Sequence, residues 1–181
     1  MTVNTQLLTN RLLVIFTPGS QPQTYADAAA AWSSTLDQYF QQAEDTSGDT
    51  PITVNLTGLY DALHSLFVSA NGSIGGPTVA TAAQAFADGF EAYWSGAVFR
   101  VDTPPVTWVS ELSSTVTNVV TTPLKSDLEH IFSDLSTHAT PESKAAAIAL
   151  AFQSAVTNDV TVTITGKNNL DQPVSITGKL S

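Results

Sequence analysis

The sequence predicts a single α+β domain over residues 1–181, in which Ala- and aromatic-rich amphipathic helices pack together with a small antiparallel β element that includes a C-terminal hairpin. Large apolar residues recur every three or four positions in several segments between residues 25 and 157, which is the helical period. Residues 160–165 instead alternate valine or isoleucine with threonine, which is the period of a half-buried strand. A chain of this length can fold without a metal or disulfide.

The first apolar segment is the run LLVIF at residues 12–16, followed by a turn signal, TPGS, at residues 17–20. A membrane span needs about 20 apolar residues, and a signal peptide needs a longer apolar core, a basic head and a cleavage site. We therefore interpret the run as a buried strand or short helix. We expect it, with part of 98–122, to pair with the hairpin, because an isolated hairpin is marginally stable.

Three helices are expected over residues 25–44, 58–70 and 78–95. Thr24 is the expected N-cap of the first helix, and Pro77 is expected in the first turn of the third. Residues 45–51 (DTSGDTP) separate the first two helices, and Gly72 to Pro77 separates the second from the third. The apolar stripe of the second helix consists of Leu59, Leu63, Leu66 and Phe67.

Residues 98–122 lack a clear helical period. Pro104 and Pro105 exclude a central strand at their position and favour an extended or turn segment. Residues 113–122 are rich in threonine and valine but do not alternate cleanly. A capping box from Ser126 to Glu129 then predicts a helix over 126–137, and the run Thr140-Pro141-Glu142 predicts a final helix over 141–157.

The C-terminal hairpin is expected over residues 159–179. Val160, Val162 and Ile164 form its apolar face, residues 166–172 form its turn, and Val174 and Ile176 begin the return strand. The opposite face is rich in threonine, as expected for a half-buried antiparallel sheet.

Two of the helices superimpose at an offset of 54 residues, since AAAAWSSTLDQYF (28–40) matches AAQAFADGFEAYW (82–94), and AAIALAFQSAV (146–156) matches more loosely. Either an internal repeat or independent selection of similar amphipathic helices explains the match. In both cases the large residues belong to a core, because aromatic stripes at helical spacing usually serve packing. The predicted core consists of Trp32, Leu36, Phe40, Phe86, Phe90, Trp94, Ile148 and Phe152.

The composition excludes several functions. The net charge is −10, with only 6 basic residues, so no basic stripe can form to bind nucleic acid or an anionic membrane. The chain has no cysteine, which excludes thiol nucleophiles, zinc–thiolate sites and iron–sulfur clusters. Only 12% of the residues are charged, and the uncharged polar residues that replace them suit contact with other protein subunits.

Three residues at helical spacing, His130, Asp134 and His138, are the nearest approach to a metal site. The two histidines are two turns apart, a rise of about 12 Å, so they cannot share one ion on a continuous helix. Asp127 and Glu129 precede His130, yet no nucleophile motif accompanies them. We interpret this segment as a solvated polar helix face.

The remaining motifs also favour structural explanations. The Gly-rich segment from Gly72 to Pro77 lacks the preceding strand and the lysine of a phosphate loop. Capping and solubility account for the carboxylate pairs Asp45/Asp49 and Asp88/Glu91, while Asp159 and Asp171 lack the spacing of a calcium loop. The glycosylation-type triplets at residues 55–57 and 71–73 arise easily by chance. The sequence therefore predicts no catalytic, cofactor-binding or metal-binding residue and no cofactor.

The segments LLVIF, QTYADAAAAWSSTLDQYF, VATAAQAFADGFEAYWSGAVF, ESKAAAIALAFQSAV and VTVTITG cover most of the chain. Their order and character resemble small structural-module proteins of tailed bacteriophages. The resemblance implies a virion component of the neck, tail or baseplate, found in the virion or in the host cytoplasm during assembly. It implies contacts with protein partners or with copies of the same chain, and no enzymatic role. It transfers no functional residue.

Two other classes of function remain open. One is a small binding module, adhesin-like or ligand-carrying, and the other is a hydrolase with an unrecognised site. The hairpin favours an assembly role, because its charged residues Lys167, Asp171 and Lys179 lie only in the turn or at the end. An uncharged strand edge of this kind can accept a neighbouring strand through backbone hydrogen bonds.

Overall fold

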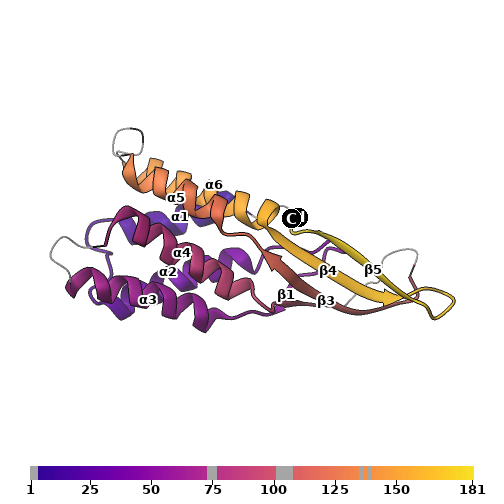
Figure 1. The fold of residues 1–181 in the computed structure, drawn as a ribbon. Helices are drawn as coiled ribbons and strands as arrows, with labels where there is room; N and C mark the ends of the chain where they lie inside the picture. The colour runs from indigo at the N-terminus through magenta and orange to yellow at the C-terminus, as the bar shows by residue number, and fades with distance from the viewer. Residues whose placement is uncertain (1–3, 73–76, 101–107, 135–136, 138–139) are drawn as a thin grey trace.

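A computed structural model describes residues 4–72, 77–100, 108–134, 137 and 140–181. Within these residues the chain forms six α-helices and one antiparallel sheet of five strands. The helices form a bundle, and the long strands of the sheet project from one end of it, so the molecule is elongated (Figure 1). The predicted α+β class and the C-terminal hairpin are confirmed.

The six helices form a closed ring around a shared core. Each helix packs against the next one along the chain, and the first also packs against the last. Within the described residues, none has the length and apolar character required to cross a membrane. The helices are α1 (Thr5–Phe16), α2 (Tyr25–Phe40), α3 (Leu56–Gly72), α4 (Val79–Trp94), α5 (Thr122–Ser133) and α6 (Pro141–Asp159).

The N-terminal apolar run forms part of a helix, α1, which packs against α6 and α2. The expectation that it pairs with the hairpin is wrong. The side chain of Asn4 accepts a hydrogen bond from the amide of Leu7 and so caps a helix that starts seven residues before the run. The buried residues of α1 are Leu8 and Leu12, which lie one turn apart. Because Leu8 precedes the apolar run, the run alone did not show the helical period.

Thr24 caps α2 as predicted, and it accepts a hydrogen bond from the amide of Asp27. Thr140 caps α6 in a reciprocal arrangement with Ser143. The helix α4 is capped by Thr78, so Pro77 precedes the helix and does not occupy its first turn. These caps satisfy amide groups that would otherwise lack partners at the helix starts.

The predicted capping box at Ser126 is wrong, because α5 begins four residues earlier and ends at Ser133. Pro123 lies in the first turn of α5, where its fixed φ angle suits a helix and its missing amide costs no hydrogen bond. Ser126 and Glu129 therefore lie within the helix. Glu129 forms an exposed ion pair with Lys125.

All eight predicted core residues are buried in one cluster. Phe40 lies near its centre and contacts Phe90 and Trp94 of α4 and Phe152 of α6, with ring centroids 5.5, 5.7 and 5.8 Å away. Residues at matching positions of α2 and α4 meet directly, since Trp32 also lies 4.9 Å from Phe86. The sequence similarity between these helices thus corresponds to equivalent places in one core.

The sheet has the order β1-β2-β3-β4-β5, with every neighbouring pair antiparallel. Its strands are β1 (Pro51–Thr53), β2 (Val98–Phe99), β3 (Ser110–Val119), β4 (Val160–Lys167) and β5 (Pro173–Lys179). The predicted pairing of 98–122 with the hairpin is confirmed by β3. Its register with β4 shifts twice, which explains the absence of clean alternation. Pro104 and Pro105 lie outside the described residues.

The two strands of the hairpin differ in burial. Alternate residues of β4 are buried, including Val160, Val162 and Ile164, as predicted. In contrast, β5 is mostly exposed, and its Ile176 retains 38% of its accessible surface. The apolar face of the sheet therefore continues onto a strand that this chain leaves partly uncovered.

Candidate functional site

The histidine segment does not form a compact polar site. His130 is exposed in α5, and Asp134 lies just beyond the end of that helix, where it accepts a hydrogen bond from the amide of Thr137. His138 lies outside the described residues. Within the described ranges, no group of three histidine, aspartate or glutamate side chains could hold a metal ion.

The carboxylate of Asp45 has a structural role that the sequence did not reveal. We expected Asp45 and Asp49 to serve capping and solubility at a helix end, yet Asp45 is only 3% exposed. It accepts hydrogen bonds from the amides of Ser47 and Asp49 and from the hydroxyl of Ser114 in β3. It therefore joins the turn after α2 to the centre of the sheet.

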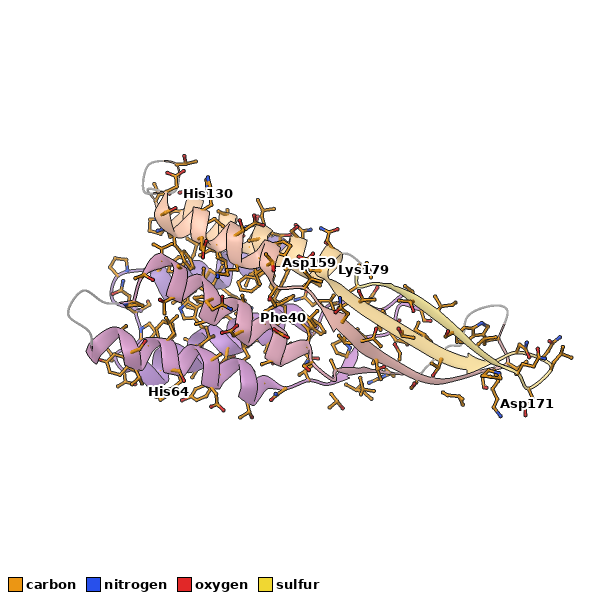
Figure 2. All side chains as sticks on the ribbon, viewed as in Figure 1. Phe40, His64, His130, Asp159, Asp171 and Lys179 are labelled. Carbon is orange, nitrogen blue, oxygen red and sulfur yellow. The ribbon has the colours of Figure 1, made fainter. Side chains whose placement is uncertain are left out.

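Asp159 and Asp171 lie at opposite ends of β4, so they do not share a site (Figure 2). Asp171 adopts a positive φ of 58° in the hairpin turn and forms an ion pair with Lys167 at 2.8 Å. Burial raises the pKa of the Asp159 carboxyl, and Lys179 opposes this shift while Asp127 adds to it. Asp159 lies at the base of the projecting sheet.

The raised pKa of Asp159 predicts a pH-dependent stability. A carboxyl whose pKa is higher in the folded state costs stability once it is ionised, and this cost develops as the pH rises from the unfolded value of about 3.9. Asp159→Asn should therefore raise the melting temperature at pH 7. The gain should vanish below about pH 4, where both side chains are neutral. Thermal unfolding at both pH values tests this, and an equal effect at both would contradict it.

A partly buried polar contact joins α2 to α4. The hydroxyl of Tyr93 donates to the carboxylate of Asp37 at 2.7 Å, and the side chain of Gln41 contacts both residues. Burial raises the pKa of Tyr93, and the hydrogen bond to Asp37 adds to the shift, so this hydroxyl stays protonated at neutral pH. The hydrogen bond between this hydroxyl and the carboxylate thus connects α2 to α4.

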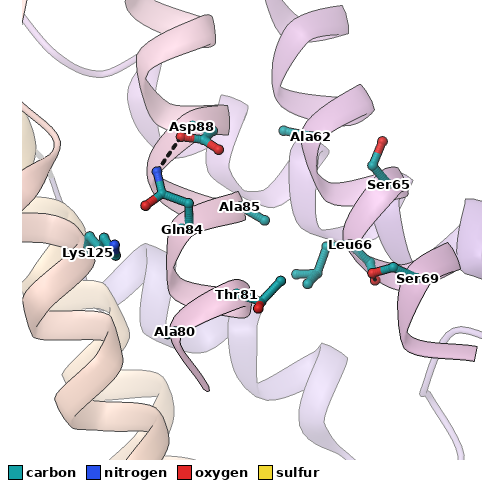
Figure 3. Close-up of a pocket in the computed structure, with 10 residues that line it drawn as sticks. All are labelled: Ala62, Ser65, Leu66, Ser69, Ala80, Thr81, Gln84, Ala85, Asp88 and Lys125. Carbon is teal, nitrogen blue, oxygen red and sulfur yellow. Dashed lines mark hydrogen bonds between the residues drawn. The ribbon is translucent and has the colours of Figure 1, made fainter. Parts of the chain in front are cut away.

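An open groove of about 540 Å³ lies between α3 and α4 and reaches Lys125 of α5 (Figure 3). Small residues such as Ala62, Ser65 and Ala85 form most of its lining. The carboxylate of Asp88 already accepts a hydrogen bond from Gln84 at 2.6 Å. Hydroxyl groups of serine and threonine, together with Gln84, Asp88 and Lys125, supply the polar groups of the groove.

The projecting sheet has one face of hydroxyl groups. Ser113 bonds to Thr165 across β3 and β4, and Thr163 bonds to both Thr117 and Thr177. At the base of the sheet, the ammonium group of Lys179 donates to Thr161. These side chains bond to one another across three strands, so the middle of the face is polar and uncharged.

The far end of the sheet exposes large apolar side chains. Leu170 in the hairpin turn is 71% exposed, and Val109 and Leu112 are also exposed. Leu112 lies where the register of β3 shifts between Glu111 and Ser113. We call Val109, Leu112 and Leu170 the tip residues. Exposed apolar side chains at the end of a projecting element are typical of a contact surface.

The outer edge of β5 faces no other described strand, but directly beyond its end Ser181 exchanges both backbone hydrogen bonds with Glu44. The amide of Asn168 donates to the carbonyl of Gln172, and this pair determines which residues of the hairpin exchange backbone hydrogen bonds. Counting along the register from this pair, every second residue of β5 directs its backbone amide and carbonyl toward β4. These residues are Val174, Ile176 and Gly178. The backbone groups of Ser175, Thr177 and Lys179 therefore point away from the sheet.

Charge is divided unevenly between the C-terminal hairpin and the rest of the chain. Residues 160–181 contain Lys167, Lys179 and Asp171, a net charge of +1. Because the whole chain has a net charge of −10, residues 1–159 carry a net charge of −11. The projecting hairpin is thus the part of the molecule that another acidic protein surface repels least.

No family model matches the chain, and neither a curated protein nor a solved structure matches it.

Proposed function

We propose that this protein is a non-enzymatic assembly component that acts through protein–protein contacts made by the projecting sheet. The observation that carries the proposal is the combination of an unpaired strand edge with exposed apolar tip residues at the end of the molecule opposite the helical bundle. The resemblance of the helical segments to structural modules of tailed bacteriophages supports a place in the neck, tail or baseplate. The protein would then reside in the virion, or in the host cytoplasm during assembly.

The chemistry of the sheet suits a contact surface. Burying an exposed apolar side chain is worth about 25 cal/mol per Å², and the hydroxyl face loses less free energy on desolvation than a charged face would. The low number of basic residues argues against nucleic acid and anionic membranes as partners. The surface of the projecting sheet therefore suits contact with other proteins or with copies of the same chain.

Leucine-to-serine replacements at two exposed positions test this proposal. Leu170→Ser alters the tip, and Leu150→Ser alters a leucine of α6 that is 58% exposed on the helical bundle. Light scattering of the full chain, alone and with the products of neighbouring genes, should show association that Leu170→Ser weakens about tenfold and Leu150→Ser leaves unchanged. A strict monomer that binds none of these proteins would contradict the proposal.

The groove between α3 and α4 favours a second candidate, a small binding module (Figure 3). Its volume falls within the range of small-molecule sites. An ordered ligand that co-purifies in this groove would support that function, particularly if Ala85→Phe, which fills the groove, removed the ligand without changing the melting temperature.

A further inference from the structure

We propose that a groove between α2 and α3 binds the side chain of a lysine residue from a partner protein. The groove holds the ammonium group against the carboxylate of Asp37 and the alkyl chain against the ring of Tyr60. This inference goes beyond the proposed function, because it places a second contact surface on the helical bundle, away from the projecting sheet.

The groove lies where α2 and α3 pack side by side (Figure 1). Its volume of about 380 Å³ is near the lower end of the range for small-molecule sites, which suits a single long side chain. Asp37 is the only charged residue among the described residues that line it. From α2 the lining includes Ser33, Ser34 and Asp37, and from α3 it includes Leu56, Thr57 and Tyr60.

The carboxylate of Asp37 is held in place with one oxygen unused. Its Oδ1 accepts hydrogen bonds from the hydroxyl of Tyr93 at 2.7 Å and from the side chain of Gln41 at 3.3 Å. Its Oδ2 accepts none from the part of the chain that the structure describes. Because the two donors already orient the carboxylate, an ammonium group that bonds to Oδ2 does not have to order it.

This arrangement favours lysine over arginine. The guanidinium group of arginine binds a carboxylate most strongly through both oxygens at once, and Oδ1 of Asp37 is already bonded to two donors. The ammonium group of lysine is a compact charge with three donors. It can therefore use Oδ2 alone and direct its other donors to hydroxyl groups or water.

The ring of Tyr60 is placed to cover the bound side chain. It stacks on the imidazole of His64, with ring centroids 5.6 Å apart and planes inclined by 16°. His64 lies one helical turn after Tyr60, whereas Leu56, which also lines the groove, lies one turn before it. The face of the ring opposite His64 is therefore the face directed to the groove, where it can contact a cation and its alkyl chain.

Charge complementarity favours a cationic occupant. Residues 12–99, which include α2, α3 and α4, contain eight aspartate and glutamate residues and no lysine or arginine. A cation from another molecule is consequently attracted to an acidic region in which these three helices supply no lysine or arginine to compete for Asp37.

The residues at the mouth of the groove suit a lysine that belongs to a polypeptide. Ser34 of α2 and Thr57 of α3 both line the groove and are exposed. Their hydroxyl groups can form hydrogen bonds with the peptide groups on the two sides of the lysine. Leu56, which is 40% exposed, offers apolar surface beside them. A free alkylamine lacks the peptide groups that would use these contacts.

NMR titration of the isotope-labelled full chain with four model compounds tests the site. N-acetyl-lysine methylamide carries the lysine side chain and both peptide groups, and its norleucine counterpart lacks only the ammonium group. The lysine compound should shift the amide signals of groove residues and bind at least about tenfold more tightly than the norleucine compound, because only lysine bonds to Oδ2. The arginine counterpart and n-butylamine should each bind about threefold or more weakly than the lysine compound.

Asp37→Asn changes the proposed acceptor. The amide oxygen can still accept from Tyr93, but the amide nitrogen then takes the place of Oδ2 and presents donors to the ammonium group. The affinity for the lysine compound should fall at least about tenfold. Asp61→Asn is the matched control, since it removes the same charge from an exposed position of α3 outside the groove lining. It should change the affinity less than about twofold, because water and salt screen an exposed charge.

Two variants of Tyr60 test the contact with the ring. Tyr60→Leu removes the ring and should weaken binding of the lysine compound about two- to fivefold, the range of an exposed cation–π contact. Tyr60→Phe keeps the ring and should have little effect. Unchanged melting temperatures would show that the variants fold, and the comparison of lysine with norleucine on the unaltered chain does not depend on any variant.

The outcomes separate this inference from the proposed function. Equal binding of the lysine and norleucine compounds, or equal effects of Asp37→Asn and Asp61→Asn, would overturn the site. Tighter binding of the arginine compound would overturn the choice of lysine, and equally tight binding of n-butylamine would overturn the polypeptide as its source. Leu170→Ser should leave this binding unchanged, because Leu170 lies in the hairpin turn of the projecting sheet. The groove and the sheet can therefore fail their tests independently.

Discussion

Replacing Phe40 by alanine should destabilise the protein by about 3–5 kcal/mol, because the change removes a buried aromatic side chain and leaves a cavity. Phe40 is fully buried, and its ring contacts aromatic residues of both α4 and α6. A cavity at this point loosens three helices of the ring at once. Since typical domains are stable by only 5–15 kcal/mol, the variant should unfold at a much lower concentration of urea.

Tyr25→Ala provides the matched control, since Tyr25 is an exposed aromatic residue at the start of the same helix. Its effect should stay within about 0.5 kcal/mol, as is usual for surface positions. Equal shifts of the urea midpoint for the two variants would show that Phe40 does not contribute to the core as the structure indicates.

Replacing Asp45 by alanine should cost about 2–3 kcal/mol, the range expected when buried groups lose a charged hydrogen-bond partner. The change leaves two amides, those of Ser47 and Asp49, and the hydroxyl of Ser114 without the acceptor that they share. Asp45→Asn should cost less, because an amide oxygen can still accept from one or two of these donors. Chemical denaturation of both variants gives the comparison.

A double-mutant cycle with Ser114→Ala shows whether Asp45 acts on the sheet or only on its own turn. If the carboxylate joins the turn to β3, the two substitutions should be non-additive, with a coupling of about 1–2 kcal/mol. Additive effects would mean that the contact between Asp45 and Ser114 contributes nothing, and that the turn alone accounts for the loss.

The predicted helices and hairpin were close to the observed elements because each has a strong local signal. Trp32, Phe86 and Phe152 recur with large partners at helical spacing, and residues 160–165 alternate without interruption. The predicted helix boundaries differ from the observed ones where two local sequence signals compete. The box beginning at Ser126 has the better capping side chains, yet α5 starts at Thr122. Pro123 lies in its first turn, where the missing amide of proline needs no capping partner.

The features of the candidate site depend on contacts that are distant in sequence, so local patterns could not reveal them. Nothing near Asp45 indicates that Ser114 will bury it, since 69 residues separate the two. Likewise, the threonine alternation predicted a half-buried hairpin without showing that β5 would end the sheet and remain exposed. Of the tip residues, Leu112 lies at a register shift in β3, which only the pairing with β4 defines.

The contact between α1 and α6 has a consequence for how the chain folds during synthesis. The two helices close the ring, yet more than a hundred residues separate Phe16 from Pro141. A ribosome adds about 5–20 residues per second, so the apolar side of α1 waits several seconds for its partner to be translated. During that interval the nascent chain exposes Leu8 and Leu12, which are buried only in the finished ring. Early termination before α6 should therefore yield fragments that aggregate or recruit chaperones.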